Sequence, residues 1–367
     1  MREPSKPVGG DQYIPTLDGW RAISILLVLA FHSPGWDQQF FMARHGGLGV
    51  AIFFVISGYL ITSRLLSEKN QNRSISLKSF YIRRLFRLAP AAGAYLVITL
   101  ILGLFQVIPL GWKGLFACIL LVRNYWWPTD PGDNYSGHFW SLTVEEHFYL
   151  FFPFLITFAR RRQTFAIIIF AITLAVIWRY TSTRLGWYKH YSNNPFFFLL
   201  TDLRIDNLLW GCLAAVCIDL WKWRPTGTIY NAISWVLIFI LFYCLHLIFK
   251  STNIYFSLMP PTATLLLVIT AHNPQHILGR FLELPPMRWL GRISYSLYLF
   301  QQFFMIHLMP PETSWLGQLQ VFPYNFLASF ACATISYYCL ERPMISLGKR
   351  FLRRSKTTPA PTTSPSA

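Results

Sequence analysis

Three side chains in the first apolar stretch have types and spacing that suit chemistry. Residues 16–33 read TLDGWRAISILLVLAFHS, an apolar run interrupted by Asp18, Arg21 and His32. Ionisable side chains are costly inside a membrane span, so each predicts a functional role. Arg21 and His32 lie eleven positions apart, about 16 Å along one face of a helix, and Asp18 lies one turn before Arg21. We expect His32 and Asp18 to be catalytic; the alternative is an interfacial ion pair and a packing histidine.

A second cluster of arginines suits phosphate binding. Residues 80–90 read FYIRRLFRLAP, in which Arg84 and Arg87 are one helical turn apart. Guanidinium forks match the oxygens of phosphate groups. Together with Arg21, these two arginines are expected to bind a phosphate-bearing cofactor or donor. An ordinary basic anchor that contacts lipid headgroups is the alternative.

A third stretch predicts a polar cavity. Residues 137–153 read GHFWSLTVEEHFYLFFP and combine His138, Trp140, Glu145, Glu146 and His147 at the start of an apolar segment. A helix cap would explain one glutamate only. We expect Glu145 and Glu146 to be catalytic, and His138 and Trp140 to bind substrate.

Two further stretches supply substrate-binding candidates. Residues 201–211 read TDLRIDNLLWG and place Arg204 and Asp206 in an apolar context, where Asp206 suits a buried cation. Residues 290–302 read LGRISYSLYLFQQ and contribute Tyr295. Serines in such helices often only allow close packing.

The composition is typical of a polytopic membrane protein. Of the 367 residues, 54% are hydrophobic and 13% charged. Apolar segments long enough to cross a bilayer recur along the chain, and they are too continuous for barrel strands. We therefore predict an all-α membrane helix bundle of about ten transmembrane helices. The predicted spans are residues 18–36, 46–66, 89–108, 141–158, 164–180, 203–220, 229–249, 255–272, 289–308 and 323–343.

Basic residues set the expected orientation. The formal net charge is +17, but the cations cluster in short loops between apolar segments, as in the positive-inside pattern, so a nucleic acid is not expected as a partner. Both termini are then cytoplasmic, provided that the short segment 112–126 is re-entrant or peripheral. No secretory signal peptide is expected at residues 1–13.

Other sequence features carry less chemistry. The expected organisation is a cytoplasmic segment 1–12, a membrane domain 13–345, and a tail 346–367 that is basic and then disordered. The six cysteines lie in apolar segments without metal spacing, so we expect no metal site.

Taken together, these motifs resemble the acyltransferase-3 family of integral membrane acyltransferases. The matching stretches cover residues 13–345 and include LDGWRAISILLVLAFH, GGLGVAIFFVISGYLIT, FYIRRLFRLAP, FWSLTVEEHFYLFFP, GRISYSLYL and ERP. Relatives often have a histidine after the SYSLYL stretch, where this chain has Phe300 and Gln301. Many relatives also have an appended hydrolase-type domain, which is not expected here.

The resemblance implies a function. It implies transfer of an acyl group, usually acetyl, from cytoplasmic acyl-CoA to a hydroxyl of an extracytoplasmic glycan or lipid-linked sugar, without a metal. The basic residue and histidine of the family match Arg21 and His32, and its paired arginines match Arg84 and Arg87. His32 is then the general base, and both direct transfer and an acyl-histidine intermediate remain open. A glycolipid transporter or flippase with the same polar cavity is the alternative, ahead of a structural membrane protein.

Overall fold

The structure is built from helices throughout the residues that it describes. This computed structural model describes residues 13–33, 46–126, 130–186, 199–223, 225–247, 252–306 and 314–357. Its α-helices are α1 Pro15–His32, α2 Gly46–Asn72, α3 Leu77–Leu104, α4 Trp112–Ile119, α5 Phe139–Phe158, α6 Arg161–Leu185, α8 Thr201–Trp221, α9 Thr228–Leu247, α10 Thr252–His272, α11 Ile277–Leu282, α12 Pro285–Met305, α13 Trp315–Leu319, α14 Tyr324–Ser336 and α15 Arg342–Thr357. A 3-10 helix, η2 Pro131–Ser136, and a π-helical turn, η4 Tyr337–Glu341, join them. The predicted all-α fold is confirmed.

The bundle is a multi-pass membrane protein. By length and composition alone, four helical stretches in the described part of the chain can cross a membrane: Gly46–Asn72, Leu77–Leu104, Arg161–Leu185 and Ile254–His272. A helix lies at each of the ten predicted spans. Large apolar side chains such as Leu104, Phe170 and Phe239 are exposed on α3, α6 and α9, where lipid replaces a protein partner.

The helix in the short segment after α3 is too short to cross a membrane by itself. Helix α4 has eight residues, which gives a length of about 12 Å, against about 30 Å for the hydrocarbon core. The peptide then turns at Leu120 and Leu121 toward η2. This matches the predicted re-entrant or peripheral segment.

Close packing at the centre depends on glycines. Helix α2 packs along α8 and also contacts α1 and α5. A Cβ atom built on Gly58 would lie 2.0 Å from the carbonyl oxygen of Leu208, and one on Gly211 would lie 2.1 Å from that of Val55. Because neither position has room for a side chain, the α2 and α8 backbones approach closely, as is typical of membrane helices.

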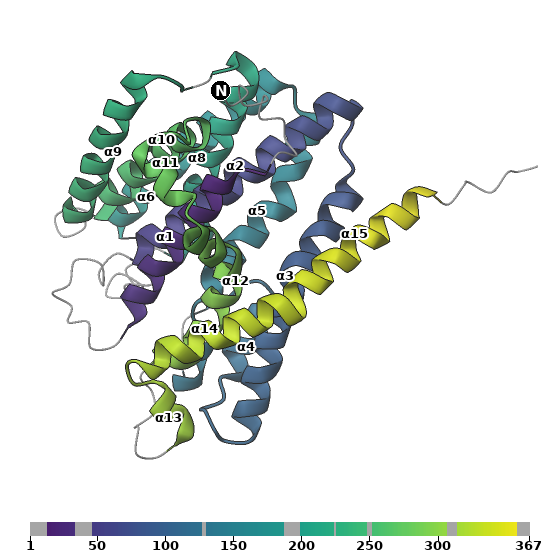
Figure 1. Cartoon of the computed structure of the whole chain (residues 1–367), viewed down its shortest axis with the longest axis vertical. Helices are drawn as coiled ribbons and strands as arrows, with labels where there is room; N and C mark the ends of the chain where they lie inside the picture. Colours follow the sequence, from purple (N-terminus) through teal and green to yellow (C-terminus); the bar gives the residue numbers. More distant parts are fainter. Residues whose placement is uncertain are drawn as a thin grey trace, which may run out of the picture.

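Two helices extend past boundaries that were predicted from the sequence. Helix α3 begins at Leu77, not near residue 89, because the side chain of Ser76 caps it by accepting from the backbone N–H of Ser79 at 3.2 Å. The arginine motif therefore lies within the helix. At the other end, the expected domain boundary at 345 falls inside α15, which runs across α3 and away from the bundle (Figure 1). The rest of the expected tail, residues 358–367, lies outside the described residues.

Candidate functional site

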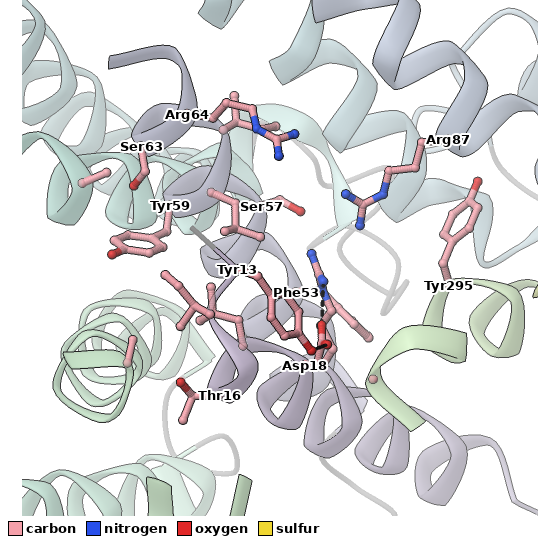
Figure 2. Close-up of a pocket in the computed structure, with 18 of the residues that line it drawn as sticks. Tyr13, Thr16, Asp18, Phe53, Ser57, Tyr59, Ser63, Arg64, Arg87 and Tyr295 are labelled. Carbon is pink, nitrogen blue, oxygen red and sulfur yellow. Dashed lines mark hydrogen bonds and ion pairs between the residues drawn. The ribbon is translucent and has the colours of Figure 1, made fainter. Parts of the chain in front are cut away.

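A large charged cavity opens between the helices. Its volume is about 1310 Å³, and α1, α2, α3, α5, α8, α12 and the η4–α15 junction contribute side chains to its walls (Figure 2). Nine cationic and five acidic side chains line it, so the cavity is electropositive. The cations are Arg21, Arg64, Arg83, Arg84, Arg87, Lys222, Arg288, Arg292 and Lys349, and the acids are Asp18, Glu145, Asp219, Glu283 and Glu341.

Asp18 is the centre of one wall of this cavity. Its carboxylate accepts a hydrogen bond from the Tyr13 hydroxyl at 2.5 Å and pairs with Arg21 at 3.3 Å and Arg292 at 3.8 Å. Arg288 donates in turn to the Tyr13 hydroxyl at 3.3 Å. Asp18 is only 4% exposed, so this carboxylate fixes several cavity cations and lies at the opposite end of α1 from His32.

Glu145 lies in the same cavity, on α5. One carboxylate oxygen accepts from the Ser57 hydroxyl at 2.7 Å, and the other lies 3.9 Å from a terminal nitrogen of Arg84. The Arg84 guanidinium carbon lies 3.4 Å from the centroid of the Tyr149 ring, a cation–π contact. Glu145 is therefore paired with α2 and α3 instead of with His32. Its neighbour Glu146 does not line the cavity.

Arg87 differs from the other arginines of this wall. Its guanidinium points into the cavity (Figure 2), and it makes no hydrogen bond or ion pair with any other described residue. Tyr295 lines the cavity beside it and donates to the backbone carbonyl of Leu88 at 2.9 Å, which ties α12 to α3. The cavity thus presents a cation whose donors are unused.

His32 lies at the far end of α1 and does not line this cavity. Its Nδ1 lies 2.9 Å from the carbonyl oxygen of Val28. A carbonyl can only accept, so Nδ1 carries the hydrogen and the neutral ring keeps a lone pair on Nε2. Among the described residues Nε2 has no hydrogen-bond partner, so it is available as a proton acceptor.

His138 is buried next to Tyr298, a residue of the cavity wall. It is 3% exposed, and its ring packs edge-on against Tyr95 at 5.0 Å and Tyr298 at 5.6 Å between ring centroids. Tyr298 lines the cavity and donates to the backbone carbonyl of His138 at 2.9 Å. The imidazoles of His32 and His138 are close enough to interact electrostatically. Tyr298 thus links the cavity wall to His138.

Trp140 and Arg204 lie outside the cavity, behind residues that line it. The Trp140 ring packs against Phe54, a cavity residue, with 6.0 Å between ring centroids. The guanidinium of Arg204 lies 5.6 Å from the Trp140 ring and 4.0 Å from the Phe256 ring. Neither Trp140 nor Arg204 reaches the cavity itself.

Asp206 also lies outside the cavity, in a closed ion pair. Its carboxylate lies 2.6 Å from Arg179, and both side chains are fully buried. Arg179 further donates to the carbonyl of Leu203 at 3.0 Å and to the Ser257 hydroxyl at 3.1 Å. The predicted buried cation partner is thus confirmed as Arg179, a residue that the sequence reasoning overlooked although it interrupts the apolar run of α6.

The histidine-rich stretch on α5 does not form one cluster. His147 contacts the Thr201 hydroxyl and the carbonyl of Leu121, both at 2.8 Å, on the side away from Glu145. Sequence reasoning also missed Ser57, Arg292 and Glu341 as cavity residues. Ser57 and Arg292 lie in motifs that had been noted, but only the packing of α2, α5 and α12 shows which face they occupy.

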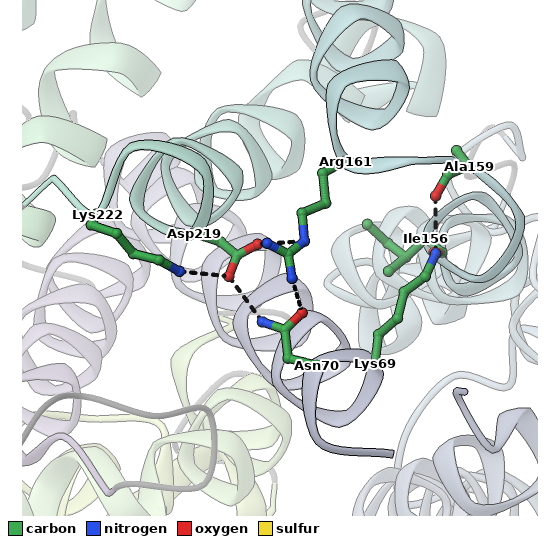
Figure 3. Close-up of polar contacts among 7 residues, drawn as sticks. All are labelled: Lys69, Asn70, Ile156, Ala159, Arg161, Asp219 and Lys222. Carbon is green, nitrogen blue, oxygen red and sulfur yellow. Dashed lines mark hydrogen bonds and ion pairs between the residues drawn. The ribbon is translucent and has the colours of Figure 1, made fainter. Parts of the chain in front are cut away.

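A polar network fixes the cavity wall between α2 and α8 (Figure 3). Asp219 accepts from Asn70 at 3.0 Å and pairs with Arg161 at 3.2 Å and Lys222 at 3.4 Å. Next to it, Lys69 donates to the carbonyls of Ile156, Thr157 and Ala159 at the end of α5, between 2.6 and 3.0 Å. These contacts satisfy the last carbonyls of α5 and hold α2, α5, α6 and α8 together.

Cysteines and metal ligands do not add to this site. Burial raises the pKa of the Cys118 thiol on α4 to about 12, which keeps it an unreactive packing group. In the described part of the chain, no three His, Cys, Asp or Glu side chains gather closely enough to hold a metal ion.

Comparison with known proteins gives the family. The model of a family described as "Acyltransferase domain" matches residues 14–341. The O-acetyltransferase OatA of Staphylococcus aureus is 29% identical over 94% of this chain and 60% of its own length. The peptidoglycan O-acetyltransferase OatA of Listeria monocytogenes is 29% identical over 91% of this chain and 56% of its own.

This chain spans less than two thirds of the length of these relatives, and no solved structure matches it. The family match nevertheless runs from the first turn of α1 to the π-helical turn before α15, and so includes almost every wall of the cavity. The chain belongs to the acyltransferase-3 family of membrane acyltransferases.

Proposed function

We propose that this protein transfers an acyl group, with acetyl as the expected group, from acyl-CoA to a hydroxyl of a glycan or lipid-linked sugar. The observation that carries the proposal is the electropositive cavity of about 1310 Å³, with nine cationic and five acidic side chains in its walls. A donor with several phosphates and a long arm suits such a cavity in charge and size. The printed names of the relatives, O-acetyltransferase and peptidoglycan O-acetyltransferase, support acetyl transfer to a glycan.

The orientation follows from the basic residues. The same end of the bundle, formed by α2, α3 and α15, carries exposed cations outside the cavity, among them Arg73, Lys78 and Arg350. By the positive-inside rule this end faces the cytoplasm, where acyl-CoA is made. We therefore assign the protein to the cytoplasmic membrane with both termini inside and His32 toward the outer side. Residues 13–345 are then the acyltransferase domain.

The chemistry needs a base at the far end of α1. In direct transfer, Nε2 of His32 takes the proton of the acceptor hydroxyl while that oxygen attacks the thioester carbon. The carbon–sulfur bond breaks, and the proton passes to the thiolate to give CoA. The free lone pair on Nε2 supports this role. Asp18 and Glu145 then serve the donor cavity, where their contacts lie.

The test is a transfer assay on the purified full-length chain. With acetyl-CoA labelled in the acetyl group and a glycan acceptor, label on the acceptor and equal release of CoA thiol are expected. Movement of acceptor across a reconstituted membrane without label transfer would instead indicate a flippase, and would overturn the proposal.

A further inference from the structure

The two arginines of one motif, Arg84 and Arg87, have different surroundings. They are one turn apart on α3 and both line the cavity. If each bound the donor as a phosphate fork, both would need donor atoms that face the open space. Arg84 has an ion-pair partner and an aromatic support, whereas Arg87 has neither among the described residues.

The Arg84 guanidinium already contacts two other side chains. It lies over the Tyr149 ring at 3.4 Å from the centroid, and a terminal nitrogen lies 3.9 Å from Glu145. Its Nε is buried and has no hydrogen-bond partner, so this donor cannot reach a ligand in the cavity. Tyr149 is 1% exposed, which makes the ring a fixed support.

Glu145 is fixed from two sides. The Ser57 hydroxyl on α2 donates to one carboxylate oxygen at 2.7 Å, and Arg84 on α3 faces the other. Because these two contacts come from different helices, they set where the carboxylate lies in the cavity. Without Arg84, the serine hydrogen bond would be the one direct contact of this carboxylate that remains among the described residues.

Arg87 has the opposite character. No acid or carbonyl among the described residues pairs with it, and its guanidinium points into the cavity (Figure 2). Arg21, the nearest comparable arginine, is paired with Asp18 at 3.3 Å. An unpaired guanidinium at a cavity wall is available to an anionic ligand.

We infer that Arg87 contacts the anionic part of the donor, whereas Arg84 is a positioning residue that, with Ser57, holds the Glu145 carboxylate in place. This inference rests on the proposed function and divides the labour within its donor site. It also names Ser57 as a positioning residue.

The test separates donor affinity from turnover. CoA is titrated into the purified full-length protein, and kcat is measured with acetyl-CoA. Arg87→Ala should weaken CoA binding by about 10- to 100-fold, the usual loss for one charge-assisted contact. Arg84→Ala should leave CoA affinity within about threefold and lower kcat by about 10- to 100-fold, as expected when a reacting geometry is lost. Lys78→Ala, an exposed cation at the start of the same helix, is the matched control and should change neither.

Glu145→Gln provides an independent route, because it leaves Arg84 in place if Arg84→Ala does not fold. It should reproduce the fall in kcat, and adding Arg84→Ala to it should cost little more, since both changes remove one interaction. Equal losses of CoA affinity in Arg84→Ala and Arg87→Ala, or normal turnover of Glu145→Gln, would overturn the division. A wild-type protein that neither binds CoA nor transfers acetyl would instead overturn the proposed function.

Discussion

Two groups of charges inside this bundle differ in how much of their bonding capacity is used. In the Arg179–Asp206 pair, the 2.6 Å contact, the Leu203 carbonyl and the Ser257 hydroxyl surround the guanidinium, and both side chains are fully buried. In the cavity, Arg87 has no partner among the described residues. We therefore expect the fully paired charges of this bundle to be structural and the unpaired ones to bind a ligand.

The same contrast holds for two histidines. Both ring nitrogens of His147 have partners, the Thr201 hydroxyl and the Leu121 carbonyl, each at 2.8 Å. His32 uses Nδ1 alone, at 2.9 Å from the Val28 carbonyl. All five residues in these two comparisons are ionisable groups in apolar stretches. Residue type therefore cannot separate the paired groups from the unpaired ones, whereas unused hydrogen-bonding capacity can.

The strongest test of this contrast replaces each of the two histidines by alanine in a separate variant. His32→Ala should lower the transfer rate by about 10²- to 10⁴-fold, the usual contribution of a general base. His147→Ala should leave the rate near wild type and lower only the melting temperature. Acetyl transfer by the two purified variants measures this, and comparable activity of both would remove His32 from the mechanism.

Substitutions in the Arg179–Asp206 ion pair should change the stability of the protein. Asp206→Ala leaves Arg179 buried without its counter-charge, which typically costs about 3–5 kcal/mol. The expected result is a lower melting temperature and less folded protein. The double variant Arg179→Leu/Asp206→Leu removes both charges and should be less damaging. A stable Asp206→Ala protein with weakened acceptor binding would place Asp206 in the substrate site instead.

Substitution of Asp18 should have a smaller effect, a change in KM for the donor. Asp18→Asn keeps the side-chain shape but removes the charge that holds Arg21, Arg292 and the Tyr13 hydroxyl. With about 0.5–1.5 kcal/mol per weakened hydrogen bond, KM for acetyl-CoA should rise a few-fold while kcat changes little. Steady-state kinetics checks this. A large fall in kcat at constant KM would favour the catalytic role first predicted for Asp18.

The smallest effect is expected from probes of orientation. Cysteines introduced at Arg73 and Lys113, exposed positions before α3 and on α4, should not alter activity. In intact cells, a membrane-impermeant thiol reagent should label the Lys113 variant and spare the Arg73 variant, relative to the parent chain. Labelling of the Arg73 variant alone would reverse the proposed orientation, and with it the side from which the donor enters.

Much of the fold followed from the sequence, because apolar length and basic loops depend on local composition. All ten predicted spans correspond to helices, and the eight-residue α4 agrees with the predicted peripheral segment. The start of α3 was missed because its first turns carry arginines, which hydropathy assigns to a loop. Ser76 caps the helix, which begins at Leu77, twelve residues before the expected start.

The site was harder to assemble from sequence. Asp18, Arg21, Arg84, Arg87, Glu145 and Tyr295 do share one cavity. The sequence reasoning grouped Asp18 and Glu145 with His32, but these two acids line the cavity and His32 does not. Spacing along one helix does not show which neighbouring helix packs against it. Arg179 interrupts an apolar run as clearly as Asp206 does, and the two are linked only by the packing of α6 on α8.

The π-helical turn η4 gives the C-terminal helix a defined angular register. Its wider turn comes just before α15, on which Gly348 lies against the Phe86 side chain and Lys349 lines the cavity. Loss of one residue within η4 would rotate α15 by about 100° relative to α14, since an α-helix has 3.6 residues per turn. Gly348 would then leave Phe86 and the Phe86–Phe351 ring contact would be lost. The spacing between α14 and α15 is therefore a geometric constraint on α3, the helix that carries the arginine pair, and single-residue length changes there should be tolerated far less than substitutions.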